Sequence, residues 1–437
     1  ISERGVAEAR LVKRSVDARS RGGVHFSLTA DVTLAQGGEA EEKRLAARFK
    51  PNQVTVISGA AAGDTPDVFG LKLAPWPAGK ARPLVVGAGP AGLFCALALA
   101  VRGARPIVVE RGKPVEARER DVDRLEACGE MDPESNVLFG EGGAGAFSDG
   151  KLTCGLNSPH IRTVLGTLVR CGAPEEILVA QRPHIGTDEL RRVLVGVRAA
   201  LRRLGAEVRF ETRLTGLILQ KGRVTGARLA GAAGEEELAT DTVCLAIGHS
   251  ARDTYEWLCS LGLPMQQKPF AIGVRIEHLQ RDIDRAQYGA FAGHPALGAA
   301  EYRLSAHLSN GRGVYTFCMC PGGVVVQTAC APEQSAVNGM SCYARDGENA
   351  NAAVLRARRQ AVFGGAQARV ARQRAELRAV DERLRMLHAH AHGEGLLLHG
   401  HAQPVQEGER LRRAVEQRCL YAPDGLDLQH DLSLIHI

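Results

Sequence analysis

Three glycines in a fixed spacing are the residues of this sequence best suited to a specific chemistry. Gly87, Gly89 and Gly92 form the pattern G-x-G-x-x-G. In such a pattern the first glycine permits a tight turn, the second lets the backbone approach a pyrophosphate, and the third allows a helix and a strand to pack closely. Glu110 lies close to the offset of about 20 residues at which an acidic side chain binds a ribose. These residues predict a dinucleotide site; the alternative is a glycine-rich turn in another kind of α/β protein.

The elements that must position these glycines are all present around them. Residues 84–86 are an apolar run of the length of a buried strand, residues 93–101 form an Ala/Leu-rich helical stretch, and residues 106–109 are a second apolar strand. In this strand–turn–helix–strand unit the first amide groups and the positive end of the helix dipole face the phosphates. We therefore include Pro90 and Ala91, within the turn, among the predicted cofactor contacts.

A second glycine-rich stretch, residues 139–153, also fits the spacing G-x-G-x-x-G through Gly140, Gly142 and Gly145. No helical pattern follows it, so we interpret it as a flexible loop whose backbone amides line a bound group. Ser148 and Lys151 are its predicted polar contacts. The alternative is a glycine loop that faces solvent.

The composition indicates an ordinary globular protein. The chain has 437 residues, a formal net charge of +6 and 11 cysteines without a C-x-x-C pair, which favours reduced thiols in the cytoplasm. No run approaches the about 18 apolar residues of a membrane span.

The excess arginine lies mostly after residue 350, so we expect no nucleic-acid partner. His388, His390 and His392 do not share one helix face, and we expect no metal site.

The hydrophobic pattern divides the chain into parts of different character. We expect two strands around a turn at residues 21–23, a short helix within residues 41–50 and a strand at residues 53–57. Thr187 is a plausible N-cap of a long amphipathic helix, and residues 221–222 mark a hairpin. The predicted parts are a small N-terminal α/β domain (1–58), a linker (59–82), a Rossmann-like α/β domain (83–255) with a helical insertion (154–204), a β-rich second domain that binds the substrate (256–351) and a divergent tail (352–437).

Several strings together resemble one family, the uncharacterised bacterial FAD-dependent dehydrogenases of the glutathione-reductase-like flavoprotein superfamily. The resemblance covers roughly residues 10–351. One departure is Ala146, where the family has a threonine. The matching strings are KRSVDAR, VVGAGPAGLF, VVERG, FGEGGAGAFSDGKL, PHIGTD, AIGHSARDT, KPFAIGVRIEH, GRGVYTFCMCPGG, NGMS and RDGENAN.

The resemblance implies that the dinucleotide is FAD. The glycine turn would hold the pyrophosphate, Glu110 the adenosine ribose, and Leu214 would present its backbone to the adenine. Arg118 resembles a second pyrophosphate contact, with a solvated surface arginine as the alternative. The second glycine loop would lie along the isoalloxazine ring, and residues 246–248 would flank the cofactor. The further contacts expected from these segments are Arg111, Gly142, Gly143, Ala144, Gly145, Ser148, Ala246 and Gly248.

The function implied is an FAD-dependent oxidoreductase that passes a hydride through the flavin to or from a small-molecule substrate, with NAD(P)H as a possible transient reductant. Lys151 is a candidate for the positive charge near the flavin N1, with a salt-bridged surface lysine as the preferred alternative. Lys268, Arg275 and His278 are close in sequence and could hold an anionic substrate or donate a proton; structural salt bridges are the alternative. Two other classes stay open: a non-catalytic FAD- or NAD-binding protein, and a flavoenzyme that modifies tRNA or lipid.

Cys318 and Cys320 suggest a disulfide reductase, since side chains at i and i+2 of a strand share one face. Known redox pairs favour C-x-x-C, so packed core cysteines are the preferred interpretation.

After residue 351 the family strings stop and the composition shifts toward arginine, alanine and histidine. The last six residues, LSLIHI, look like a translated sequencing adapter. We therefore expect the chain to be a fragment whose tail (352–437) is not part of the native fold.

Overall fold

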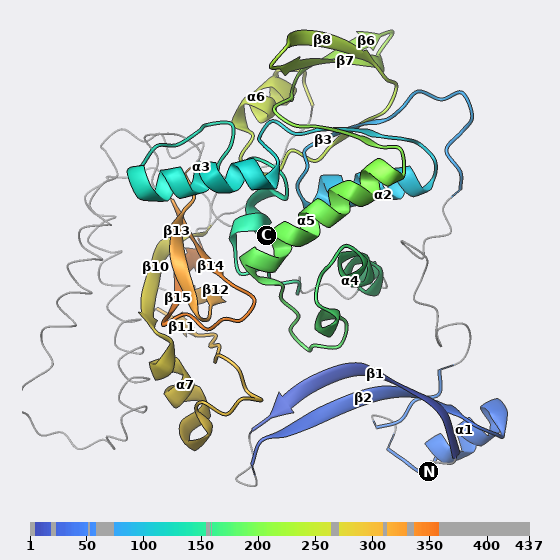
Figure 1. Ribbon diagram of the computed structural model, residues 1–437, viewed down its shortest axis with the longest axis vertical. Helices are drawn as coiled ribbons and strands as arrows, with labels where there is room; N and C mark the ends of the chain where they lie inside the picture. Colours follow the sequence, from blue (N-terminus) through green and yellow to red (C-terminus); the bar gives the residue numbers. More distant parts are fainter. Residues whose placement is uncertain are drawn as a thin grey trace, which may run out of the picture.

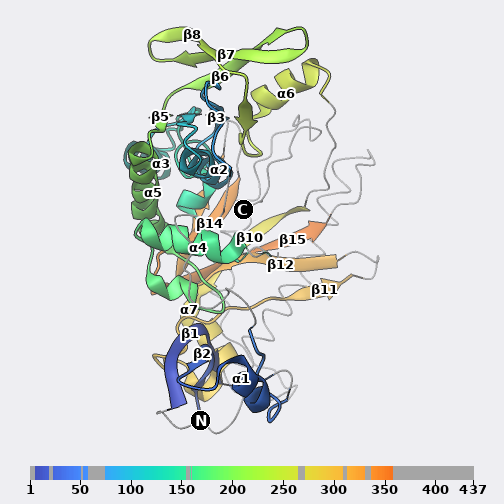
Figure 2. The ribbon, with the colours of Figure 1, turned by 90° about the vertical axis from the view of Figure 1, so that its right-hand side faces the viewer.

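The computed structural model describes the chain in segments. They are residues 5–18, 23–50, 53–57, 74–153, 158, 160–263, 271–308, 313–329 and 336–357. Lys268, most of the expected linker and residues 358–437 lie outside them. Figures 1 and 2 show that the β6–β8 sheet and the β1–β2 hairpin lie at opposite ends of the long axis.

A four-stranded parallel sheet forms the centre of the predicted nucleotide-binding unit. Its order is β5 (Glu207–Arg209), β4 (Ile107–Val109), β3 (Leu84–Val86) and β9 (Val243–Leu245). Strands buried on both faces read as continuous apolar runs, as β3 and β4 do. The mixed α/β class with a parallel sheet is confirmed.

Three helices pack around this sheet. They are α2 (Pro90–Val101), α3 (Val115–Cys128) and α5 (Gly186–Arg203), and Figure 1 shows α5 beside α2. The main apolar core lies between the sheet and these helices; Val85, Leu97 and Val108 are fully buried there. Within the expected insertion, α4 (His160–Arg170) and the 3₁₀ helix η3 (Glu175–Leu178) precede α5.

A three-stranded antiparallel sheet follows α5 along the chain. It consists of β6 (Arg213–Gln220), β7 (Arg223–Gly231) and β8 (Gly234–Ala239), and α6 (Arg252–Ser260) comes after β9. The predicted hairpin at residues 221–222 is confirmed by the β6–β7 pairing.

The second large sheet is antiparallel, as the β-rich pattern predicted. Its order is β10 (Ala271–Leu279), β15 (Asn349–Ala357), β12 (Gly313–Cys320) and β11 (Ser305–His307). The hairpin of β13 (Gly323–Gln327) and β14 (Val337–Ser341) lies against it, and α7 (Gln280–Tyr288) and the 3₁₀ helix η4 (Gly289–Phe291) follow β10. Because β15 is an inner strand that runs to Ala357, the expected boundary at residue 351 moves to at least residue 357.

The N-terminal segment is a long hairpin, β1 (Val6–Asp17) and β2 (His25–Leu34), followed by α1 (Gly38–Ala46). The two strands and the helix are confirmed, but residues 53–57 form no strand. The hairpin joins the insertion because the Arg14 amide donates to the carbonyl oxygen of Val179 at 2.7 Å. Among the described residues, no helix is long and apolar enough to cross a membrane.

Candidate functional site

The first glycine turn has the geometry that its spacing predicts. Gly87 adopts φ +104°, and a Cβ there would lie 2.3 Å from the Ala246 carbonyl oxygen. A Cβ on Gly92 would lie 1.8 Å from the Gly87 carbonyl oxygen, so only glycine lets α2 begin so close to β3. Gly89 precedes α2 without a side-chain cap, and the nearest atom to a Cβ there is Gly143 Cα at 3.9 Å. The second glycine is therefore the one with free space beside it.

Glu110 is buried directly behind this turn. Its Oε2 accepts a hydrogen bond from the Ala88 amide at 2.7 Å, and its Oε1 accepts from the amides of Gly112 and Gly140 at 3.0 Å each. One carboxylate thus joins the first glycine turn, the end of β4 and the second glycine loop. Only 6% of Glu110 is exposed, and its role toward a ribose stays a prediction.

The second glycine loop folds back onto the first turn. The Gly142 amide donates to the Ala88 carbonyl oxygen at 2.8 Å, and residues Gly143–Phe147 form the 3₁₀ helix η2. Gly142 adopts φ +83°, and a Cβ there would lie 2.3 Å from Leu194 Cδ1. The loop that we interpreted as flexible is therefore a packed turn at Gly142, although a Cβ on Gly145 would meet no atom within 4 Å. Pro90 and Ala91 open α2 beside it.

Two hydroxyl groups donate hydrogen bonds to carbonyl oxygens of η2 and fix its shape. The Ser148 hydroxyl donates to the Gly145 carbonyl oxygen at 2.9 Å. Thr187 lies inside α5 rather than at its N-cap, which is Ile185, and its hydroxyl donates to the Ala146 carbonyl oxygen at 2.7 Å. Ala146 is fully buried, while Gly143, Ala144 and Gly145 are partly exposed.

Arg118 has a different role from both sequence interpretations. It is fully buried, and its guanidinium donates to the carbonyl oxygens of Asn136 (2.7 Å), Val137 (2.8 Å) and Glu141 (2.6 Å). Burial lowers the pKa of this guanidinium to about 10. Because no part of it reaches the surface, Arg118 is a clamp for the loop rather than a surface arginine or a direct pyrophosphate contact.

The remaining predicted cofactor contacts surround the same turn. Arg111 lies over the Phe139 ring at 4.3 Å and forms ion pairs with Glu134 and Asp253, so its charge is already paired. Leu214 is buried in the apolar cluster below β3 and β4. Ala246 follows β9, and its amide donates to the Val86 carbonyl oxygen at 2.8 Å. Gly248 lies two residues further, in a left-handed conformation at φ +71°.

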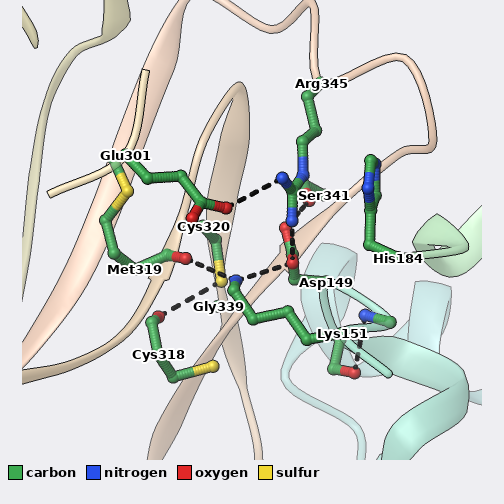
Figure 3. A network of polar contacts seen from close by, with 12 residues as sticks. Asp149, Lys151, His184, Glu301, Cys318, Met319, Cys320, Gly339, Ser341 and Arg345 are labelled. Atoms are coloured by element: carbon green, nitrogen blue, oxygen red, sulfur yellow. Dashed lines mark hydrogen bonds and ion pairs between the residues drawn. The ribbon is translucent and has the colours of Figure 1, made fainter. Parts of the chain in front are cut away.

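The end of the second glycine loop meets the antiparallel sheet through buried polar groups, which Figure 3 shows. The Lys151 ammonium donates to Asp149 Oδ2 at 2.6 Å and to the Met319 carbonyl oxygen at 2.5 Å. Asp149 is fully buried and also accepts from Arg345 and the Ser341 hydroxyl. Burial acts to raise the pKa of Asp149, but the charges of Lys151 and Arg345 outweigh it, and the pKa lies below its usual value.

Further contacts extend this group, which we call the Asp149 network. Arg345 binds Glu301 at 2.9 Å through its other terminal nitrogen. His184 Nε2 lies 2.9 Å from the Tyr343 carbonyl oxygen, with the two rings stacked. Burial lowers the pKa of His184. The network therefore joins the glycine loop to strands β12 and β14.

Arg275 and His278 have different neighbours in the fold. Arg275 donates to the Cys318 carbonyl oxygen at 3.0 Å and to Asn351 Oδ1 at 2.6 Å. His278 packs instead against Tyr302, with ring centroids 5.5 Å apart. Residues three apart on a strand point to opposite faces, so the sequence cluster is separated on β10. Lys268 lies outside the described residues.

Sequence reasoning missed the residues that complete the network. Asp149, Ser341 and Arg345 were not singled out, although they lie in the strings FGEGGAGAFSDGKL, NGMS and RDGENAN. A signal existed, because an acidic residue two positions from Lys151 is a natural partner for it. The partner across 196 positions of sequence, Arg345, could not be found without the fold.

Two protein-family models match this chain. Residues 82–118 match a family described as FAD binding domain, and residues 269–388 match one described as FAD-dependent protein, C-terminal domain-like. The first range holds the glycine turn and Glu110; the second holds the antiparallel sheet and extends past the expected boundary at residue 351.

Two curated proteins are similar in sequence. An uncharacterised protein of Clostridium beijerinckii is 41% identical over 361 residues, which are 81% of this chain and 64% of that protein. A dihydrolipoyl dehydrogenase of Pseudomonas aeruginosa is 31% identical over 196 residues, 42% of this chain and 40% of that protein. The chain thus spans less than two thirds of either relative.

Among solved structures, a glycerol-3-phosphate dehydrogenase from Bacillus halodurans complexed with FAD is 14% identical, with a TM-score of 0.31 over 65% of this chain and 49% of that one. A geranylgeranyl bacteriochlorophyll reductase-like protein from Thermoplasma acidophilum is 15% identical and also has a TM-score of 0.31. The match covers 63% of this chain and 56% of that one.

FAD is the cofactor of this chain. The residues fit it: α2 begins without a side-chain cap, so its first amides are free for phosphate, and Gly89 leaves space in front of them. The two glycine loops enclose this position, and Glu110 holds both.

Proposed function

We propose that this protein is an FAD-dependent oxidoreductase that transfers a hydride between a small-molecule substrate and the flavin, with NAD(P)H as a transient reductant. The observation that carries the proposal is the pair of facing glycine loops, one at the start of α2 and one at η2. Bound FAD supplies the hydride-accepting chemistry, while the protein supplies its position and its electrostatic surroundings.

The first turn and α2 would hold the pyrophosphate, with Glu110 toward the adenosine ribose and Leu214 toward the adenine. Residues Gly142–Ser148 would lie along the ring system. Their amides need no reorganisation, because Arg118, Ser148 and Thr187 already fix the loop.

The substrate side of the site would be the boundary between η2 and the antiparallel sheet. Lys151 and Arg345 pair with the carboxylates of Asp149 and Glu301 at this boundary, and Arg275, which binds the Cys318 carbonyl oxygen, adds a third positive charge. The excess of positive charge supports an anionic substrate. Lys151 would act by its charge and not as a proton donor, because its ammonium is held by Asp149 and Met319.

The Gly145→Val variant tests the cofactor position without disturbing the fold. A Cβ on Gly145 meets no atom within 4 Å, so the apoprotein should unfold at an unchanged urea midpoint, while the flavin ring loses its space. We expect at least tenfold weaker FAD binding, measured by flavin fluorescence titration. The matched control is Gly166→Ala on α4, which also meets no atom within 4 Å. FAD binding of wild-type strength in Gly145→Val would contradict the assignment.

Anaerobic addition of NADH or NADPH to the flavin-loaded protein separates the functional classes. Bleaching of the oxidised flavin spectrum supports the oxidoreductase. The non-catalytic alternative is supported by two negative results together. Neither NADH nor NADPH changes the flavin spectrum, and the dithionite-reduced protein is not reoxidised by quinones or oxygen. Turnover only with an added tRNA or lipid would support the modifying flavoenzyme.

A further inference from the structure

Cys318 and Cys320 lie at an irregular point of strand β12. Phe317 pairs with Ala353 and Cys320 pairs with Asn351, so three steps along β12 oppose two along β15. This is a β-bulge with one extra residue, and bulges often re-aim side chains next to functional sites. Cys318 adopts φ +44°, a left-handed conformation that a side chain rarely takes. The preferred sequence interpretation, packed core cysteines, fits the buried Cys320, but Cys318 is partly exposed and lies in the bulge.

The bulge brings the two thiols together. The Cys320 thiol donates a hydrogen bond to the Cys318 carbonyl oxygen at 3.3 Å, and the two side chains lie next to each other. Cys320 is fully buried, whereas Cys318 is partly exposed and both are free thiols. Cys318 is thus the more accessible of the two cysteines.

Positive charge surrounds this pair. The Arg275 guanidinium donates to the Cys318 carbonyl oxygen and lies 3.9 Å from the Cys320 sulfur. The Lys151 ammonium binds the carbonyl oxygen of Met319, the residue between the two cysteines. The neighbouring Cys320 thiol and the charges of Lys151 and Arg275 lower the pKa of Cys318 to about 6, although burial and the charge of Asp149 act in the opposite direction. A thiolate, not a thiol, is the nucleophile in disulfide exchange.

The neighbouring strand holds this arrangement rigidly. A Cβ on Gly339 of β14 would lie 2.3 Å from Asn351 Oδ1, 2.4 Å from Arg275 Nη1 and 2.7 Å from the Cys320 sulfur. The glycine therefore lets β14 press against the pair and its cation. A site fixed by packing on several sides is what a reactive group requires.

We propose that Cys318 and Cys320 form a redox-active dithiol that exchanges with disulfides. The Cys318 thiolate attacks one sulfur of a disulfide R–S–S–R, forms a mixed disulfide and releases one thiolate. Cys320 then attacks the Cys318 sulfur, gives its proton to the solvent, and releases the second thiolate. The Cys318–Cys320 bond closes; the pair loses two electrons and the disulfide gains them.

The chain offers a second thiol pair as an internal control. Cys95 on α2 and Cys244 on β9 are also neighbouring thiols, and both are partly exposed. The lowered pKa of Cys244 stems from Cys95 alone, opposed by burial, without a contribution from a cation. If the proximity of two thiols alone causes reactivity, that reactivity should therefore appear at both pairs.

The test uses the full chain and oxidised glutathione at pH 7.5, with peptide mapping by mass spectrometry. We expect two equivalents of glutathione to be released as the Cys318–Cys320 disulfide forms, at least tenfold faster than any reaction at Cys95 or Cys244. Cys320→Ala should stop at a glutathione adduct on Cys318, and Cys318→Ser should abolish reaction at this site. Circular dichroism shows whether each variant is folded.

A pH profile distinguishes an activated thiol from an accessible one. Alkylation of Cys318 by iodoacetamide should rise with a midpoint near the pKa of about 6, and Lys151→Gln should move that midpoint upward. The proposal is overturned if Cys318 in the folded wild-type chain stays unmodified, if glutathione remains attached to it without release, or if both cysteine pairs react equally fast. None of these outcomes depends on bound flavin, so the result is separate from that of the proposed function.

Discussion

At the scale of single residues, buried charges in this protein are held by backbone groups as much as by opposite charges. Glu110 receives three amide hydrogen bonds, and Arg118 donates three bonds to carbonyl oxygens. Charge-assisted hydrogen bonds of this kind are stronger than neutral ones and leave little freedom to the loops that make them. The first and second glycine loops are therefore fixed through side chains that are themselves almost inaccessible.

The residue-scale prediction concerns Glu110. In Glu110→Gln one carboxylate oxygen is replaced by an NH₂ group. This NH₂ must face at least one of the backbone N–H groups that now donate to the carboxylate. An unsatisfied buried donor costs about 1–3 kcal/mol. We expect the free energy of unfolding to fall by about 2 kcal/mol in urea titrations. The control is Glu237→Gln on β8, whose side chain is 63% exposed and pairs with Arg228; it should change stability by less than about 0.5 kcal/mol. Equal effects of the two substitutions would contradict the role of Glu110.

At the scale of elements, Glu141 links the second glycine loop to two helices. Its Oε2 accepts from the Val115 amide at the start of α3 (2.9 Å) and from Arg198 on α5 (3.0 Å). Its Oε1 is buried and has no hydrogen-bond partner among the described residues. Burial raises the pKa of this carboxyl group to about 7, although Arg198 and the Val115 amide act in the opposite direction.

Because the pKa of Glu141 is raised in the folded chain, the free energy of unfolding depends on pH in a known direction. Between about pH 4.3, the unfolded value, and pH 7, the folded chain keeps the Glu141 proton that the unfolded chain has lost. The contribution of Glu141 to stability should therefore fall as pH rises through this window and level off above it. The total is on the order of 3 kcal/mol. Glu141→Gln should remove this slope, which urea titrations at several pH values measure; an unchanged slope would show that the group is ionised throughout.

At the scale of the whole molecule, the nucleotide-binding unit and the antiparallel sheet are joined by the Asp149 network. Arg345 makes the contact between the residues furthest apart in sequence, because its partner Asp149 lies 196 positions away. It also binds Glu301. The side chain of Arg345 is 12% exposed and that of Asp149 only 1%. Removal of Arg345 would leave buried Asp149 with Lys151 alone to compensate its charge, and would take one charge-assisted hydrogen bond from each of Asp149 and Glu301.

We therefore expect Arg345→Met to cost about 3 kcal/mol or more in the free energy of unfolding. The matched control is Arg182→Met, because Arg182 binds the same Glu301 at 3.2 Å but is 74% exposed. An exposed pair contributes less than about 1 kcal/mol. Chemical denaturation of both variants checks the difference; similar losses would show that the network does not hold the two parts together.

The features that the sequence determined by itself depend on residues close together in the chain. The G-x-G-x-x-G spacing fixed the first turn, since Gly87 and Gly92 tolerate no Cβ, and the apolar runs around it fixed the strands of the parallel sheet. The hairpins followed from alternation and turn residues. Residues 53–57 show the limit of this reasoning, because an apolar run forms a strand only where a partner strand lies beside it.

Only the tertiary structure decided which distant residues meet. It buried Arg118, joined Asp149 to Arg345, and separated Arg275 from His278 on opposite faces of β10. It also showed that Cys318 lies in a bulge, which depends on the register between β12 and β15. The physical reason is that hydrogen-bond partners, burial and strand register are properties of pairs of segments. A periodicity within one segment specifies what that segment can form, and the packing of the others decides what surrounds it.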